Sequence, residues 1–317
     1  MNSVASIVLN RSFQLGLLAV ILIALATLPL HYQGYNIVRL LNIFMFVVLT
    51  VSWVIFSGST GYMSLASAAF FGVGIYTSAL LGDKLPIAVV VGIGALVSSC
   101  VAFLVGALTL RLRGIYFAIF TFGLVELIKH LTLWWEINME DRRGRLVVYV
   151  ENDIIFWVML SILVATLLTA YFIRRSKWGL ALQSIGENEE AAAHMGINVT
   201  LVKVITFAVS ALFVGASGAI IATRWTYIDP GIAFNPLYSF MPVLMAIFGG
   251  MGRLLGPVIG AIAFTYLKEE LGTEFPELYM LIFGIILIVA ILYMPNGLVG
   301  LIQRLWIRGF RRQDADT

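Results

Sequence analysis

The sequence predicts an all-α integral membrane protein of about ten transmembrane helices. Of its 317 residues 61% are hydrophobic and only 12% are charged, and the mean hydropathy is +0.98. A soluble domain of this length needs a more highly charged surface. The apolar residues also gather in runs close to the roughly 20 residues that a helix needs to cross a hydrocarbon core. These runs lack the alternation of barrel strands, so we expect a single helical transmembrane domain over residues 1–317.

Ten apolar runs are separated by charged or turn-rich breaks, and each is a candidate membrane span. The eighth and ninth runs are short, so we expect some spans to be short or broken. The first run continues into a chain full of further spans, and we therefore expect a retained helix there and no cleavable signal peptide. The predicted spans are residues 12–31, 38–57, 62–82, 86–110, 114–134, 153–173, 204–223, 239–251, 255–268 and 278–295.

The distribution of basic residues orients the bundle. If the N-terminus lies in the cytoplasm, 12 of the 20 Lys and Arg residues fall on the inside, as the positive-inside rule requires. Arg142, Arg143 and Arg145 oppose this orientation, but acidic residues surround them in their outer loop. We therefore expect a multi-pass protein in contact with the lipid bilayer, with both termini in the cytoplasm.

Two glycine-rich segments, residues 57–74 and 249–257, interrupt the apolar runs, and the first also carries several hydroxyl side chains. Non-helical backbone persists at membrane depth only where protein buries it or where it lines a wet cavity, and many transporters bind solutes at broken helices. Close helix packing through small residues is the alternative. The residues predicted to line a solute path are Ser57, Gly58, Gly61, Ser64, Ser67, Gly72, Gly249, Gly250 and Gly252.

Charged residues inside the apolar runs are scarce. Glu126 and Lys129 are three residues apart, so one helix face presents both and they can pair. A structural ion pair near the outer interface is one interpretation, and a role in solute or proton handling is the other. The sequence has no His/Cys cluster, no nucleophile–base pair and no Gly-x-x-x-x-Gly-Lys-Ser/Thr loop. We therefore expect no metal, no catalytic residue, no nucleotide and no nucleic acid bound by this chain.

The longest connection expected in the cytoplasm covers residues 174–203. Ser184 and Glu187 have the spacing of a capping box, acidic residues in the first turn favour the helix dipole, and three alanines follow. Gly196 is a plausible helix stop. The pattern predicts a helix of two to three turns between Gly186 and Gly196. Because such a short helix is marginal alone in water, we expect docking to stabilise it; an ordinary surface helix is the alternative.

Several motifs follow one another in order over residues 34–300. The loop 174–203 contains a Glu-Ala-Ala segment, and this loop resembles the coupling segment of ABC importer permeases. Taken together, the motifs resemble branched-chain amino-acid permeases of the LivM type. They are the Gly-rich stretch 61–74 with Ala-Ala-Phe-Phe-Gly, Arg-Leu-Arg-Gly-Ile-Tyr-Phe-Ala at 111–118, Glu126 with a basic residue at 129, Gly-Ile-Asn at 196–198 with Lys203, Ile-Asp-Pro at 228–230, Gly-Gly-Met-Gly at 249–252 with Gly-Pro at 256–257, and Pro-Asn-Gly-Leu at 295–298.

The resemblance implies the permease subunit of an ABC importer in a bacterial-type inner membrane, working by alternating access. The implied partners are a second, homologous permease subunit, two cytoplasmic ATP-binding subunits that bind and hydrolyse the ATP, and an extracytoplasmic solute-binding protein. Branched-chain amino acids are the implied cargo, with urea, short amides and other amino acids as alternatives. The residues implied in coupling to the ATPase are Ser184, Gly186, Glu187, Glu190, Ala191, Ala192 and Gly196.

Two segments depart from the family pattern. Ala66-Ser67 stands where the family often has Gly-His or Gly-Gln, and residues 136–145 replace a Thr-Gly-Gly-rich outer segment. Both differences lie where contact with solute or receptor is expected. An ion-coupled secondary transporter is the main alternative class, and it needs a deep acidic ion ligand that the sequence does not offer. A structural scaffold would leave the glycine-and-serine break unexplained.

Overall fold

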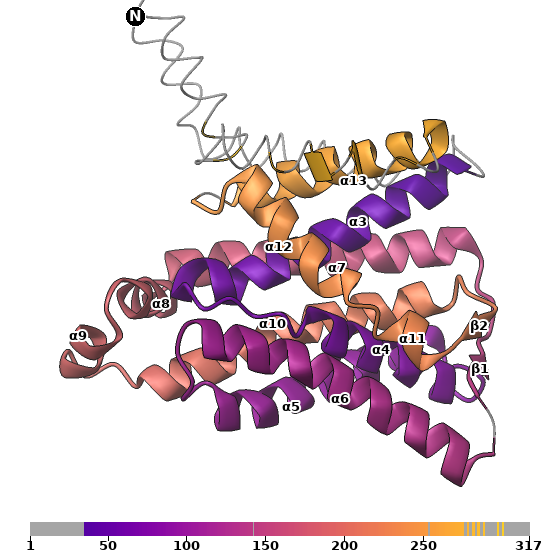
Figure 1. Cartoon of the computed structure of the whole chain (residues 1–317), viewed down its shortest axis with the longest axis horizontal. Coiled ribbons are helices and arrows are strands. Elements are labelled where there is room, and N and C mark those ends of the chain that lie inside the picture. The colour runs from indigo at the N-terminus through magenta and orange to yellow at the C-terminus, as the bar shows by residue number, and fades with distance from the viewer. Residues whose placement is uncertain are drawn as a thin grey trace, which may run out of the picture.

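The structure is a computed structural model, and it describes residues 35–141, 143–252 and 254–275, with isolated positions between 278 and 300. The predicted span at 12–31 and most of the one at 278–295 lie outside the described residues. The described part is a bundle of helices with one short two-stranded ribbon (Figure 1). In chain order its elements are α3 (Tyr35–Trp53), the π-helical turn η1 (Val54–Gly58), α4 (Ser67–Leu81), α5 (Ile87–Thr109), α6 (Ile115–Met139), β1 (Arg145–Leu146), α7 (Asn152–Arg175), α8 (Lys177–Glu187), α9 (Glu189–His194), α10 (Val199–Ala222), β2 (Tyr227–Ile228), α11 (Pro230–Ala233), α12 (Leu237–Gly249) and α13 (Leu255–Glu274).

Six helical segments of the described part are long and apolar enough to cross a membrane. They confirm six of the predicted spans, with ends shifted by several residues. The count of about ten spans is therefore confirmed only in part. The six segments are Tyr35–Gly58, Ile87–Thr109, Ile115–Met139, Asn152–Arg175, Val199–Ala222 and Pro230–Gly249.

The span predicted at 62–82 differs from an ordinary membrane helix. Only its second part, α4, is helical, and its 15 residues extend about 22 Å. This is less than the roughly 30 Å of a hydrocarbon core, so α4 alone is too short to cross it, and residues 61–66 before it are not helical. Helix α13 runs to Glu274, six residues beyond its predicted end, and its last turns carry charged side chains.

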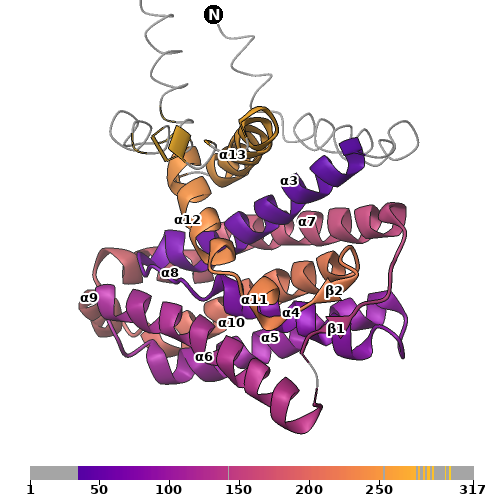
Figure 2. The ribbon, with the colours of Figure 1, turned by 45° about the vertical axis from the view of Figure 1, so that its right-hand side comes forward.

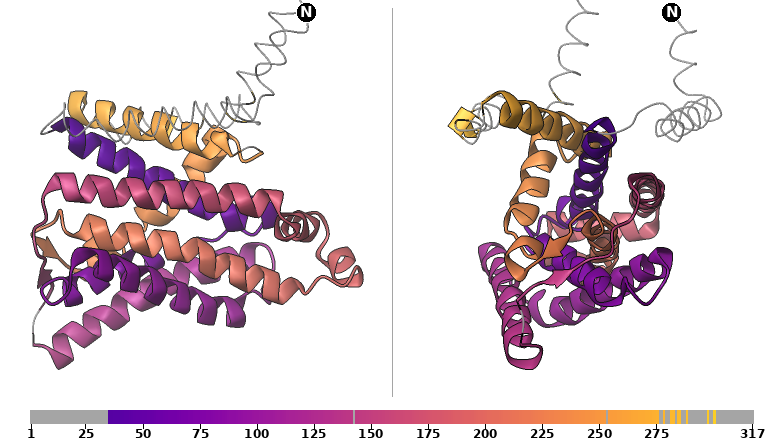
Figure 3. Two further views of the ribbon diagram at one scale, coloured as in Figure 1. Left: turned by 180° about the vertical axis from the view of Figure 1, so that it is seen from behind. Right: turned by 90° about the vertical axis from the view of Figure 1, so that its right-hand side faces the viewer.

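Helix α10 lies at the centre of the bundle, where it packs against α4 and α5 (Figures 1 and 3). Glycines allow this close packing: a Cβ atom on Gly74 of α4 would collide with the carbonyl oxygen of Gly215 on α10, and one on Gly218 would collide with that of Phe71. The two backbones therefore touch directly. Sequence patterns of small residues predict such packing.

The two ends of the bundle carry different structures. Helices α8 and α9 project at one end, and the ribbon lies at the other (Figures 1 and 3). The ribbon pairs β1 with β2 antiparallel, with Arg145 opposite Ile228. In the predicted orientation the α8–α9 end is cytoplasmic and the ribbon faces outward.

Helices α12 and α13 form a hairpin at one side of the bundle, with α13 lying over α3 (Figure 2). A salt bridge of 3.2 Å joins Arg39 Nε to Glu269 Oε2 across α3 and α13. At the hairpin turn, Arg174 of α7 donates hydrogen bonds to the carbonyl oxygens of Met251, at 3.1 Å, and Gly252, at 3.3 Å. Because α8 follows α7 directly, this turn lies at the same end of the bundle as α8.

Candidate functional site

The helix that begins as α3 breaks where the glycine-rich sequence predicts a break. It continues through the π-helical turn η1 to Thr60, and residues 61–66, which precede α4, are not helical. Gly61 has φ +73°, in the left-handed region that favours glycine, and its N–H donates to the Ser57 carbonyl at 3.0 Å. The break predicted within residues 57–74 is therefore confirmed and located at 61–66.

Side chains from three helices bind the backbone of this break. Trp53 donates its indole N–H to the Ser64 carbonyl at 2.8 Å, and Thr121 accepts from the Leu65 N–H at 2.9 Å. Ser239 donates to the Leu65 carbonyl at 2.6 Å. Non-helical backbone at membrane depth must be satisfied by protein or water, and here α3, α6 and α12 supply the partners.

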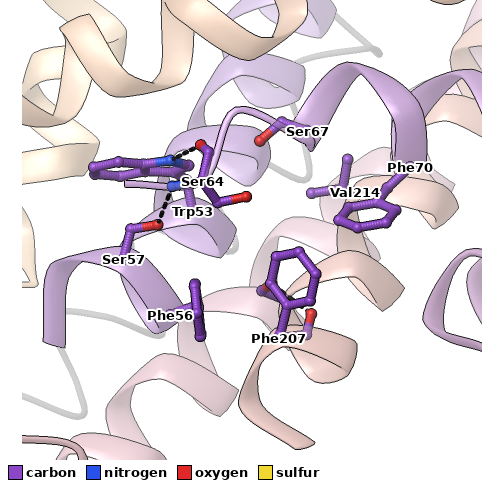
Figure 4. Close-up of a pocket in the computed structure, with 9 residues that line it drawn as sticks. Trp53, Phe56, Ser57, Ser64, Ser67, Phe70, Phe207 and Val214 are labelled. Atoms are coloured by element: carbon purple, nitrogen blue, oxygen red, sulfur yellow. Dashed lines mark hydrogen bonds between the residues drawn. The ribbon is translucent and has the colours of Figure 1, made fainter. Parts of the chain in front are cut away.

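A small cavity lies beside the break (Figure 4). Its volume is about 10 Å³, at the lower limit for one water molecule. Three of the predicted path residues, Ser57, Ser64 and Ser67, line it together. Ser210 of α10 is a fourth serine, which the sequence reasoning missed because it lies in an apolar run outside the two glycine-rich segments. Its hydroxyl also donates to Phe207 O at 2.7 Å. The complete lining is Trp53, Phe56, Ser57, Ser64, Ser67, Phe70, Phe207, Ser210 and Val214.

Aromatic rings close this serine cavity. Phe207 of α10 lies with its ring centroid 4.9 Å from that of Phe56 and 5.2 Å from that of Phe70, and its side chain is only 1% exposed. Figure 4 shows these rings around the cavity together with Ser57, Ser64 and Ser67. A solute larger than water therefore enters only if Phe207 or its neighbours move, so the described conformation is closed around the serines.

The other glycines predicted to line the path do not line this cavity. A Cβ atom on Gly72 would collide with the Phe234 ring, and one on Gly249 would collide with the Gly256 carbonyl. These two glycines serve close packing, which was the alternative interpretation. Gly250 has φ +95° and ends α12. Gly58 and Gly252 also lie away from the serine cavity, Gly252 in the turn beside Arg174.

The predicted cytoplasmic loop contains two helices where the sequence predicted one. Ser176 caps α8, and Asn188 caps α9 by accepting hydrogen bonds from two backbone N–H groups at 3.1 and 3.0 Å. The predicted helix start at Ser184 is wrong: this residue lies inside α8, and its hydroxyl donates to Leu180 O. Asn188 takes the role because its backbone is extended, as an N-cap requires.

The predicted helix end at Gly196 is confirmed. Gly196 has φ +84° and its N–H donates to Ala193 O at 3.0 Å, while the N–H of Ile197 donates to Ala192 O at 3.2 Å. These two bonds form a Schellman motif, for which glycine is the favoured residue.

Ala192 is fully buried within this chain. It packs with Leu182, Ile185 and Val202 in a cluster that joins α8, α9 and α10. Ala192 therefore fixes the loop and does not contribute to its outer surface. The exposed surface of α9 and its flanks includes Glu187, Glu190 and Ala191, together with Met195, 68% exposed, which the sequence reasoning did not single out.

Glu189 at the start of α9 points inward. It accepts a hydrogen bond from Lys203 Nζ at 2.9 Å, and the Tyr62 hydroxyl donates to its second carboxylate oxygen. Burial opposes the charged form, but the hydrogen bonds from Tyr62 and Lys203 and the charges of Lys203 and Arg113 outweigh it and lower the pKa of Glu189 below its ordinary value. Glu189 is thus a carboxylate at neutral pH.

The ion pair predicted on α6 is formed, with Lys129 Nζ in contact with Glu126 Oε2. Neither residue lines the serine cavity. The buried acid of this helix is Glu136, at 0% exposure, which accepts hydrogen bonds from the Tyr76 hydroxyl and the Gly144 N–H, both at 3.0 Å. These partners hold it near the β1–β2 ribbon.

A bundle of apolar helices with a broken helix around a small polar cavity defines a multi-pass membrane protein of the transporter class. The sequence matches the family model described as the permease component of branched-chain amino acid transport systems over residues 36–291. The chain belongs to this family.

The curated relatives are permeases of ABC transporters. The high-affinity branched-chain amino acid permease LivM of Salmonella typhimurium is 26% identical in an alignment of 288 positions that covers 80% of this chain and 67% of that protein. The L-arabinose permease AraH of Azospirillum brasilense is 24% identical in an alignment of 307 positions that covers 90% of this chain and 87% of that protein. The ribose import permease RbsC of Haemophilus influenzae is 30% identical in an alignment of 143 positions that covers 43% of each chain. No solved structure matches the chain.

The Ser67→Ala variant should weaken solute uptake without harming assembly. Among the described residues, the Ser67 hydroxyl has no hydrogen-bond partner and it faces the serine cavity, so it is free to bind a passing solute. Losing one such bond should raise the half-saturating solute concentration about threefold to tenfold. Ser161→Ala, on an exposed part of α7, is the matched control. Equal uptake kinetics for both variants would remove Ser67 from the path.

Proposed function

We propose that this chain is the membrane-spanning permease subunit of an ABC importer for branched-chain amino acids or a related small polar solute. Transport would proceed by alternating access, with ATP hydrolysed in partner subunits. The observation that carries the proposal is the break at 61–66, which lies beside the serine cavity and contacts the α8–α9 loop through Tyr62 and Glu189. Membership of the permease family supports it.

The projecting α9 is the surface we assign to the ATPase. The exposed Glu187, Glu190, Ala191 and Met195, on α9 and its flanks, lie at the end of the bundle, where a cleft of a cytoplasmic subunit can receive them. We infer two such ATP-binding subunits, a second homologous permease chain and an extracytoplasmic solute-binding protein, with ATP bound by the partners and no cofactor in this chain. The location would be a bacterial-type inner membrane with both termini in the cytoplasm.

A sugar is the second candidate cargo. The arabinose permease AraH aligns with a larger share of this chain than LivM does, and serine hydroxyls beside aromatic rings also suit a hydroxylated solute. Urea, short amides and other amino acids complete the candidates. The cavity is too small in its closed form to select among them.

Transport by the complete complex tests the proposal. The chain is purified with its partner subunits, reconstituted in liposomes with the binding protein, and supplied with labelled leucine, arabinose or urea. We expect leucine uptake that depends on ATP and on the binding protein. Uptake of arabinose but not of leucine would identify a sugar as the cargo. Uptake driven by an ion gradient without ATP would contradict the importer class.

A further inference from the structure

The cytoplasmic end of the bundle contains a buried ammonium group. Lys203 of α10 is 1% exposed, and a charge removed from water is tolerated only with close partners. Its Nζ atom donates to Glu189 Oε1 at 2.9 Å, to the Leu110 carbonyl at 3.0 Å and to the Tyr62 hydroxyl at 3.2 Å. It also lies 4.5 Å from the centre of the Tyr62 ring. All three ammonium donors are therefore used.

The partners of Lys203 come from separate parts of the chain. Glu189 begins α9, Tyr62 belongs to the non-helical break at 61–66, and Leu110 follows α5. Arg113, in the turn after α5, adds a salt bridge of 3.8 Å to Glu189. Glu189 cannot move away alone, because that would leave a buried ammonium without its counter-charge. A displacement of α9 must therefore either move Tyr62 as well or break the contacts among Tyr62, Glu189 and Lys203, at a considerable cost in free energy.

Two routes lead from Tyr62 to the serine cavity. Along the backbone, Ser64 lies only two residues further on and lines the cavity. Through side chains, the Tyr62 ring packs edge-on against Phe117 at 5.6 Å between centroids, and Phe117 packs against Phe207 at 6.1 Å. Phe207 is the ring that closes the cavity, and it lies one helical turn from Lys203 on α10.

We propose that Tyr62, Glu189 and Lys203 form a mechanical link that passes movement of α9 to the serine cavity. Tyr62 and Glu189 are then positioning residues: they touch no solute, and they set the place of the break and of Phe207 according to the position of α9. The link rests on the proposed function, because it is the ATPase that would move α9. A cluster that only anchors the loop would affect stability and leave coupling intact.

The complete reconstituted complex tests the link through the ratio of solute-stimulated to basal ATP hydrolysis, measured per assembled complex. Tyr62→Phe removes one hydroxyl and keeps the ring. It should lower the ratio about tenfold or more, because that hydroxyl makes hydrogen bonds to two charged groups, Glu189 and Lys203, with the basal rate little changed. Tyr171→Phe is the matched control, because the Tyr171 hydroxyl, near the same end on α7, makes no hydrogen bond among the described residues.

A second variant removes both charges and so avoids an unpaired one. The double variant Lys203→Met with Glu189→Gln should fold, since replacing a buried pair by groups of similar volume is often neutral. It should show the same fall in the ratio of solute-stimulated to basal ATP hydrolysis. Adding Tyr62→Phe should then have no further effect, because the three residues act as one unit. Ratios equal to wild type in both variants would overturn the link. A wild-type complex that moves no solute would instead count against the proposed function.

Discussion

The Gly215→Leu variant is expected to destabilise the bundle strongly and to lower the yield of folded protein. Gly215 lies on the central helix α10, and a Cβ atom there would collide with the Ser98 side chain of α5 and lie 2.8 Å from the Gly94 carbonyl. From the other side, the Gly215 carbonyl already touches Gly74 of α4. Overpacking a core costs about 1–3 kcal/mol or more. Here the added atoms meet the Ser98 side chain and the Gly94 backbone of α5, and backbone cannot rotate away, so we expect the upper end of this range.

The free energy of unfolding lost in Gly215→Leu is a large share of the total stability of a folded domain, which is about 5–15 kcal/mol. Size-exclusion chromatography of the detergent-purified chain measures the yield of monodisperse protein, and thermal unfolding measures the stability of what remains. Gly92→Leu is the matched control, because it lies on α5 and a Cβ atom there would meet nothing within 4 Å. If Gly215→Leu behaved like Gly92→Leu in both measurements, the close packing of α10 would be disproved.

The membrane helices were predictable because run length is a local property of the sequence. The apolar residues of α5, α7 and α10 identify a span without any knowledge of neighbours. The same signal misled at residues 62–66, which belong to an apolar run but are not helical. Their conformation depends on Thr121 and Ser239, which are far away in the sequence.

The roles of glycines and charges were less predictable because they depend on contacts between distant residues. The sequence cannot distinguish Gly61, which ends a helix, from Gly249, which packs against Gly256. From the sequence alone, Lys203 is indistinguishable from an ordinary exposed basic residue at the end of a loop. Its burial follows from Tyr62, separated from it by 141 positions in the sequence.

Helix caps in the α8–α9 loop show a third limit. Ser176, Ser184 and Asn188 are all residue types that favour an N-cap, and the sequence analysis named only Ser184, because Glu187 follows it at capping-box spacing. In the structure, Ser176 caps α8 and Asn188 caps α9. The buried cluster around Ala192 fixes where the loop turns, and this tertiary contact selects the caps.

The Gly186→Leu variant should fold and assemble but lose transport. Gly186 near the end of α8 approaches the broken helix so closely that a Cβ atom would lie 2.5 Å from the Ser59 carbonyl oxygen and 3.3 Å from the Thr60 carbonyl carbon. Backbone atoms cannot yield as a flexible side chain can, so α8 must move away from the break. The contact lies at the edge of the bundle, where such a shift leaves the α4–α10 core intact.

Displacing α8 should shift the balance between the open and closed forms of the cavity. A strain of about 1–3 kcal/mol corresponds to roughly 5–150-fold in an equilibrium between two conformations, and we expect solute uptake per assembled complex to fall within that range. Gly186→Ala should give a smaller loss, since it adds one atom. Gly123→Leu, on α6 with nothing within 4 Å of a Cβ atom, is the control for helix substitution in general. The two Gly186 variants differ only in how far they push α8 away from the broken helix. Normal uptake by Gly186→Leu, with normal assembly, would therefore show that the contact between these two segments has no part in transport.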